Sequence, residues 1–259
     1  MENCARTPMC FDQTSSFAFA GLGLFGWAGC QFFFKNPYLA NGLLFFFTME
    51  FLQGVQYWYI DDCDSLINKA LTLVGIVHIL FQPYFTHYMS RELSSKSPAT
   101  MHKYNLVSKL SLTVGLLLGL RMLMYQTATY PPTEANPTTE WLRGNQVCTF
   151  SGNFHLAWSV PMADASYLSP GVFLHTFMMF APFVLIEPHR LLLPGLILFL
   201  TGPFMATFIT DSMYEQASIW CFFSCAQIIV CGAGHLIQGY NLKTISEQRY
   251  GRGKSKKAQ

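Results

Sequence analysis

Apolar blocks of roughly 18 to 25 residues alternate with short polar segments along most of the chain. A helix rises about 1.5 Å per residue, so a block of this length crosses a hydrocarbon core of about 30 Å. In lipid, a helix also satisfies its own backbone groups. The pattern predicts an all-α polytopic membrane protein, a bundle of seven transmembrane helices, with spans at about 16–34, 38–60, 65–89, 104–126, 170–187, 191–211 and 214–238.

Three polar regions complete the predicted organisation. Residues 1–15 have no basic stretch before the first apolar block, so we expect a polar N-terminal segment and no cleaved signal peptide. The longest region outside the spans is the loop 127–169, whose run from Phe154 to Met162 is apolar enough to fold over the bundle as a lid. Residues 239–259 form a basic tail.

The composition agrees with a membrane protein, because 51% of the residues are hydrophobic and only 12% are charged. Of the 16 lysines and arginines, eleven fall on the side of the C-terminus, two on the side of the N-terminus, and three in or near spans. Basic residues favour the cytoplasmic side of membrane proteins. We therefore predict a lumenal or extracellular N-terminus and a cytoplasmic C-terminus.

The tail suggests a compartment. Lys256 and Lys257 stand fourth and third from the end, the positions of a dilysine retrieval signal for the endoplasmic reticulum. A basic tail attracted to anionic lipids is the alternative interpretation. We expect the endoplasmic reticulum, or otherwise another cellular membrane.

Four cysteines are predicted on the lumenal side, where disulfides persist. They are Cys4, Cys10, Cys63 and Cys148, and the sequence leaves three pairings open. A bond between Cys63 and Cys148 would fix the long loop over the mouth of the third span. Free thiols are the alternative.

The candidate site centres on two ionisable residues near the middle of predicted spans, Glu50 and His78. The short connection makes the second and third spans antiparallel neighbours, and both residues lie at comparable depth, roughly 15 to 20 Å from the lumenal end. A buried carboxylate is costly unless it is paired or protonated. We therefore predict that Glu50 and His78 meet as catalytic acid–base or head-group partners, or form a structural hydrogen-bond network.

Other polar residues are expected to line the same pocket. Gln53 and Tyr57 share a helical face with Glu50, and Gln82 follows His78 by one turn. The remaining predicted pocket residues are Gln227 in the seventh span, His155 in the lid run, and Arg121, a candidate counter-charge for a substrate carboxylate or phosphate. No histidine or cysteine pair has metal-ligand spacing, so we predict no metal site. The sequence does not indicate which cofactor, if any, the protein binds.

These observations favour a membrane-embedded enzyme or binding protein that acts on a lipid-like small molecule. The alternatives are a proton-coupled transporter or channel that uses Glu50 and His78 as a relay, and a structural assembly subunit. Expected partners are membrane lipids, with no nucleic acid. The glycine-rich faces of the first and fourth spans could also support a homo- or hetero-oligomer. The predicted seventh span lacks the lysine of a retinal protein.

Overall fold

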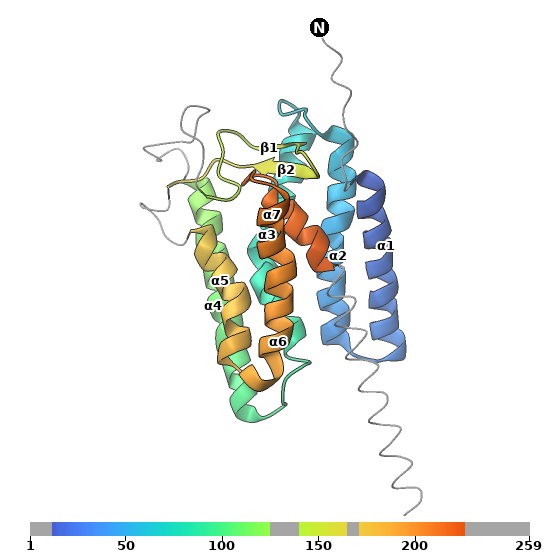
Figure 1. Ribbon diagram of the computed structural model, residues 1–259, viewed down its shortest axis with the longest axis vertical. Coiled ribbons are helices and arrows are strands. Elements are labelled where there is room, and N and C mark those ends of the chain that lie inside the picture. The colour runs from blue at the N-terminus through green and yellow to red at the C-terminus, as the bar shows by residue number, and fades with distance from the viewer. Residues whose placement is uncertain (1–11, 125–139, 165–170, 226–259) are drawn as a thin grey trace, which may run out of the picture.

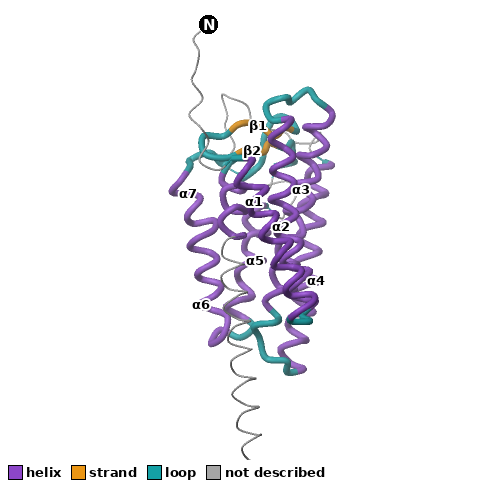
Figure 2. The backbone as a smooth tube through the Cα atoms, turned by 90° about the vertical axis from the view of Figure 1, so that its right-hand side faces the viewer, coloured by secondary structure: helices purple, strands orange, loops and turns teal. Residues whose placement is uncertain are grey.

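The computed structural model describes residues 12–124, 140–164 and 171–225. Long helices stand side by side in a bundle, and a two-stranded antiparallel hairpin lies across one end of it (Figure 1). A view turned by 90° shows the same upright arrangement (Figure 2). We call the end that carries the hairpin the hairpin end, and the end with the α3–α4 and α5–α6 connections the opposite end.

Seven α-helices and two β-strands are described. The α-helices are α1 (Gln13–Ala28), α2 (Pro37–Gln56), α3 (Leu66–Ser90), α4 (Pro98–Leu123), α5 (Val172–Leu185), α6 (Pro188–Phe199) and α7 (Met205–Ile209). A π-helical turn, η1 (Gly29–Phe33), extends α1, and another, η4 (Leu200–Phe204), joins α6 to α7. A 3₁₀ turn, η2 (Tyr57–Tyr59), follows α2, and residues 216–225 begin a further helix.

Side-chain caps define where several helices begin. Asp12, Asn36, Ser65 and Ser97 each accept a hydrogen bond from a backbone N–H in the first turn of the helix that follows. The capping oxygen satisfies a donor that has no partner within the helix. Proline at the first position of α2 and α4 fits the same rule, because its missing N–H is not needed there.

Four described helical segments are long and apolar enough to cross a membrane: 13–33, 66–90, 98–123 and 188–209. They correspond to the first, third, fourth and sixth predicted spans. The second, α2, is not among them, because polar residues such as Glu50, Gln53 and Gln56 interrupt it. The fifth is shorter than predicted, at 14 residues. The seventh is described only as far as residue 225.

The loop 127–169 contains strands that the pattern did not predict. β1 (Cys148–Ser151) pairs with β2 (Leu156–Ser159), with Cys148 opposite Ser159. Every residue of β2 is buried. Leu156 and Trp158 pack with Met49, Ile76 and other apolar residues of α2 and α3. The run predicted as a lid is therefore an integral cover of the bundle.

Glycines let helices of the same chain approach closely. A Cβ atom on Gly115 of α4 would lie 2.4 Å from the carbonyl oxygen of Leu80 in α3, and one on Gly23 of α1 would overlap the Phe47 ring of α2. By contrast, a Cβ on Gly21 or Gly29 would meet nothing within 4 Å. Part of each glycine-rich face thus serves packing within the chain, and whether the rest supports an oligomer stays a prediction.

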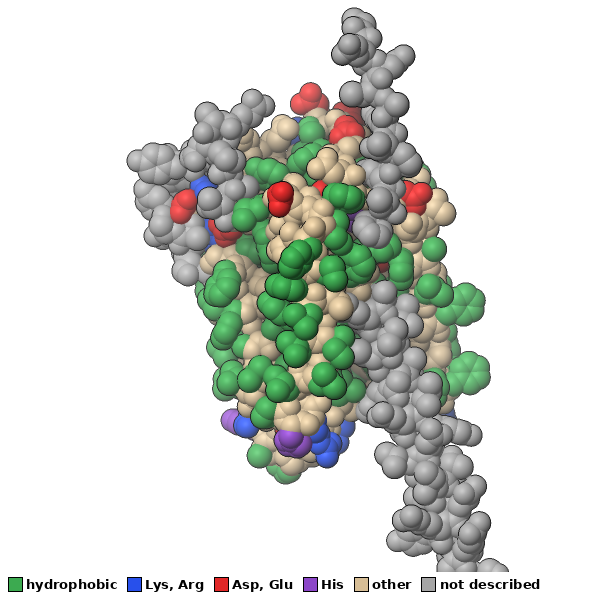
Figure 3. Space-filling view, in the orientation of Figure 1, with side chains coloured by type: hydrophobic (Ala, Val, Ile, Leu, Met, Phe, Trp, Pro, Cys, Tyr) green, Lys and Arg blue, Asp and Glu red, His purple; other side chains and the backbone are tan. Residues whose placement is uncertain are grey.

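Charge and hydrophobicity divide the surface along the bundle axis. Figure 3 shows acidic side chains at the hairpin end with some basic ones beside them, a group of basic and histidine side chains at the opposite end, and hydrophobic side chains between the two ends. The exposed belt includes large side chains such as Phe25, Phe173 and Phe208, each more than two-thirds exposed. Such an apolar belt between two charged ends is suited to a bilayer.

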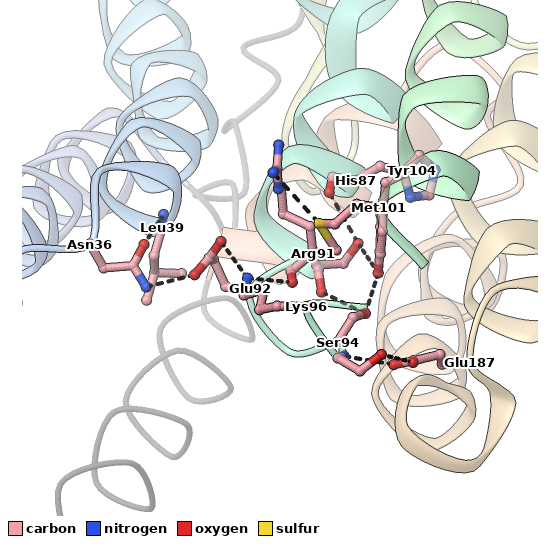
Figure 4. A network of polar contacts seen from close by, with 12 residues as sticks. Asn36, Leu39, His87, Arg91, Glu92, Ser94, Lys96, Met101, Tyr104 and Glu187 are labelled. Carbon is pink, nitrogen blue, oxygen red and sulfur yellow. Dashed lines mark hydrogen bonds and ion pairs between the residues drawn. The ribbon is translucent and has the colours of Figure 1, made fainter. Parts of the chain in front are cut away.

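A polar network ties the helix connections together at the opposite end (Figure 4). Asn36 donates to Glu92, which also pairs with Lys96. Glu187, at the start of α6, accepts from the backbone N–H and hydroxyl of Ser95 and from the Thr100 hydroxyl. These bonds hold the pKa of Glu187 at about 2, below its usual 4.5.

We expect the Glu187 contacts to make stability depend on pH. A lowered pKa in the folded state means that the charged form stabilises the fold above pH 4.5 and that this contribution is lost as the pH falls toward 2. The melting temperature of wild type should therefore exceed that of Glu187→Gln at pH 6, and the difference should shrink steadily below pH 4.5. A difference independent of pH would contradict this. Glu92→Gln is the matched control at the same end.

Candidate intramembrane site

Glu50 lies in the centre of the bundle and is fully buried. The Cys225 thiol approaches its Oε1 atom at 3.8 Å, and the Ser16 hydroxyl of α1 lies beside the carboxyl group. Among the described residues, neither Oε2 of Glu50 nor Oγ of Ser16 forms a hydrogen bond of good geometry, although the Ser16 hydroxyl lies near enough to the carboxyl group to donate to it. The structure thus buries an ionisable group with one oxygen unsatisfied, which is unfavourable unless a ligand, water or proton compensates it.

Among the described residues, no hydrogen bond joins His78 to Glu50, so the direct contact expected of an acid–base pair is not formed. His78 Nε2 contacts the Phe45 carbonyl oxygen at 2.6 Å, and the imidazole stacks on the Phe45 ring. Thr48 Oγ1 is 3.4 Å away. With about 100° of rotation per residue, Glu50 points roughly 140° or more away from Phe45 and Thr48 around α2. Equal depth on neighbouring helices places two residues at the same level of the bundle, but it does not determine in which direction each side chain points.

Three other predicted pocket residues do meet. His155 Nε2 is 2.7 Å from Gln53 Oε1, and His155 Nδ1 is 2.6 Å from the Tyr57 hydroxyl. An amide oxygen only accepts, so Nε2 donates to Gln53 and Nδ1 accepts from Tyr57. His155 comes from the hairpin, while Gln53 and Tyr57 come from α2 and η2. The hairpin therefore reaches the same face of α2 that carries Glu50.

A residue absent from the sequence prediction, Glu215, holds His155 in place. Its Oε1 atom accepts from the backbone N–H groups of Phe154 and His155 at 2.6 and 2.7 Å, and its Oε2 atom from the Thr210 hydroxyl at 2.8 Å. A Cβ on Gly152 would lie 2.5 Å from this carboxyl group, so the approach requires glycine there. The sequence feature that could have identified Glu215 as a site residue is its position as an acidic residue at the start of an apolar block.

An apolar cavity of about 70 Å³ lies beside this polar region, between α2, α3, α5, α6 and residues 216–225. Its wall includes Leu39, Phe46, Met89, Met179, Phe183 and Leu198. Glu92 and Ser90 line it near the opposite end, and Ser224 lines it near mid-bundle. The volume exceeds the minimum for a single water several times over.

Two smaller cavities, of about 10 Å³ each, continue inward. The nearer one shares Ser224 with the large cavity and is also lined by Gln82, Cys221 and Cys225. Gln82, another predicted pocket residue, donates to the Cys221 sulfur at 3.2 Å. Cys225 both lines this cavity and contacts Glu50. Glu50 itself lines none of the three described cavities, and the Cys225 side chain separates its carboxyl group from the inner one.

Arg121 does not fit its predicted role as a counter-charge for a ligand. Its guanidinium is buried and donates to both carboxylate oxygens of Glu140 at 2.7 Å, and to the Ala163 carbonyl oxygen. Glu140 also accepts from the backbone N–H of Val172 at the start of α5. The depth of Arg121 in its span suggested that it pairs with a charged ligand. Its counter-ion is instead Glu140, which lies in a loop whose path the sequence pattern did not predict.

A disulfide joins Cys63 to Cys148 and so ties β1 to the α2–α3 connection. Asn68 and Thr72 of α3 also hydrogen-bond Thr149 in β1. Five further predicted residues lie outside the described part of the chain: Cys4, Cys10, Gln227, Lys256 and Lys257.

A family model described as a family of unknown function (DUF5765) matches residues 14–240. The chain belongs to this family. No curated protein and no solved structure matches the chain. The region that matches DUF5765 contains Glu50, Gln53, Tyr57 and His155 together with every residue that lines the three cavities.

Proposed function

We propose that the chain crosses the membrane seven times, with its N-terminus in the lumen or outside the cell and its C-terminus in the cytoplasm. The four apolar helices and the alternating direction of their neighbours support this topology. Basic side chains at one end and acidic side chains with a disulfide at the other support the orientation. The dilysine positions support residence in the endoplasmic reticulum.

Within this frame, we propose that the protein binds a lipid-like small molecule in its interior. The observation that carries the proposal is the fully buried Glu50 carboxyl group, whose neighbour Cys225 lines the smaller cavity next to the large apolar one. An apolar wall favours the tail of an amphiphile, while a buried, incompletely satisfied carboxyl group favours its polar end. Glu50 then acts as the head-group partner, without His78.

Binding fits the geometry better than proton transport. A relay needs polar groups within hydrogen-bond distance of one another. Glu50 projects from one side of α2, toward Cys225, whereas His78 contacts Phe45 on another side of that helix. The large cavity is lined mainly by aliphatic and aromatic side chains, which hold a lipid tail but offer few sites for a proton or ion.

Filling the cavity should abolish binding. Ser224 is buried and lines both the large cavity and its inward continuation, so Ser224→Phe would place a ring in the proposed tail site. Native mass spectrometry of the gently purified protein should detect bound lipid on wild type and at least about tenfold less on the variant. Thr113→Phe, on an exposed face of α4, is the matched control and should retain the lipid.

Thiol labelling provides a second test of the same site. Cys221 and Cys225 line the inner cavity, whereas Cys30 is equally buried but lines none of the three described cavities. Added long-chain lipid should slow N-ethylmaleimide modification of Cys221 and Cys225, read by peptide mass spectrometry, and leave Cys30 unchanged. Equal lipid content in wild type and Ser224→Phe, with no selective protection, would overturn the proposed function.

A further inference from the structure

Within the part of the chain that the structure describes, three buried polar atoms that lack a hydrogen bond of good geometry lie where α1 and α2 pack together. They are Oγ of Ser16, Oε2 of Glu50 and Nε2 of Gln53, and all three side chains are fully buried. Glu50 and Gln53 are one turn apart on α2, and Ser16 lies beside Glu50. Two neighbouring contacts hold the helices in this register, because Gln13 donates to the Gly54 carbonyl oxygen and Phe17 packs over Gly54.

The direction of each missing hydrogen bond is set by its neighbours. Gln53 Oε1 already accepts from His155, so the Gln53 amide presents N–H donors to its unsatisfied side. Cys225, on Oε1 of Glu50, leaves Oε2 as an acceptor when the carboxyl group is ionised. The Ser16 hydroxyl can donate or accept a hydrogen bond. A compensating group must therefore accept from Gln53, and it must donate to Glu50 when the carboxyl group is ionised or accept from it when the carboxyl group is protonated.

We propose that this cluster of Ser16, Glu50 and Gln53 selects an amphiphile whose polar end is a hydroxyl group. This inference rests on the proposed function and deepens it. A hydroxyl both donates and accepts. An ammonium group would pair with an ionised Glu50 but cannot accept from Gln53, whose amide would stay unsatisfied. An ether only accepts, and an ionised carboxylate would place a second negative charge beside Glu50.

The Cys225 thiol lies between the inner cavity and Glu50. It approaches Glu50 Oε1 at 3.8 Å and the Phe46 carbonyl oxygen at 3.6 Å, both weak contacts for a sulfur donor. A ligand hydroxyl that reaches the cluster would form at Oε2 a stronger hydrogen bond than the one the thiol makes at Oε1. The tail would then follow the cavities toward Leu39 and Met89.

The test compares polar ends on one hydrocarbon chain. Full-length protein in nanodiscs is labelled with a photoactivatable long-chain alcohol, and hexadecanol, its methyl ether, hexadecylamine and hexadecanoic acid compete for the site at pH 7. Hexadecanol should compete at least about tenfold more strongly than the ether or the amine, because each leaves a buried group unsatisfied. Ser16→Ala and Glu50→Gln should each reduce this preference several-fold.

Ser111→Ala is the matched control, because Ser111 is another buried hydroxyl without a described partner but lies on α4. It should leave the preference unchanged, and circular dichroism should show that every variant compared is folded. If all four competitors bind equally well, or the preference survives both Ser16→Ala and Glu50→Gln, the hydroxyl inference is overturned while lipid binding stands; a water molecule then satisfies the cluster. If none competes, the proposed function itself fails.

Discussion

Replacing Arg121 with alanine is expected to lower the free energy of unfolding by about 3–5 kcal/mol, measured by denaturant unfolding in detergent micelles. The reason is that the variant leaves Glu140 inside the protein without the guanidinium that pairs with both its oxygens. It also leaves the Ala163 carbonyl oxygen without the two N–H donors from Arg121. Because Glu140 also binds the start of α5, the destabilisation should extend to that helix.

A matched comparison separates this buried pair from an ordinary surface pair. Lys96 and Glu92 form an ion pair at the opposite end, with the Lys96 side chain 55% exposed, so Lys96→Ala should cost at most about 1 kcal/mol. The double variant Arg121→Met/Glu140→Leu should lose less stability than the sum of its single variants, because neither charge is then left buried alone. Equal destabilisation by Arg121→Ala and Lys96→Ala would refute the assignment.

The second large effect is expected from Glu215→Ala, which should cost about 3–4 kcal/mol. It removes the acceptor for the backbone N–H groups of Phe154 and His155 and for the Thr210 hydroxyl, all near the buried hairpin. Without these hydrogen bonds, His155 should separate from Gln53 and Tyr57. Hydrogen exchange should therefore rise in residues 148–159 while α3 and α4 keep their protection.

Two further variants sharpen this prediction. Glu215→Gln keeps an oxygen for the two backbone donors and removes only the charge, so its cost should be roughly half that of alanine. Gly152→Ala leaves Glu215 intact but places a methyl group 2.5 Å from its carboxyl group, and it should expose the same hairpin residues to exchange. Unchanged exchange in both Glu215→Ala and Gly152→Ala would show that Glu215 does not hold the hairpin.

The sequence predicted those parts of the fold that depend on a single local property of the chain, such as the length of an apolar segment or a capping residue. Apolar length specified the spans of α1, α3, α4 and the α6–α7 segment, because a segment of that length and hydropathy suits a bilayer whatever its neighbours are. Capping residues such as Asn36 and Ser97 specified helix starts for a similarly local reason. The hairpin escaped prediction, since its strands are four residues long and are stabilised by contacts with distant helices.

The site was only partly predictable. Periodicity on α2 placed Glu50, Gln53 and Tyr57 on one face, and the structure keeps Gln53 and Tyr57 together through His155. Periodicity could not show that His78 faces Phe45, because sequence spacing sets the depth of a residue along its helix but does not determine how that helix is rotated against its neighbour. Nor could it show that Arg121 already has a counter-ion in Glu140, which is 19 residues away along the chain.

The sequence by itself determined that a carboxyl group lies within an apolar helix, because residue type and spacing along one helix are local properties. The tertiary structure alone decided what surrounds that group. Ser16, Gln53 and Cys225 gather around Glu50 because α1, α2 and residues 216–225 pack against one another, with Glu215 and the hairpin holding His155 above them. Such contacts depend on helix rotation and long-range packing, which no local pattern encodes.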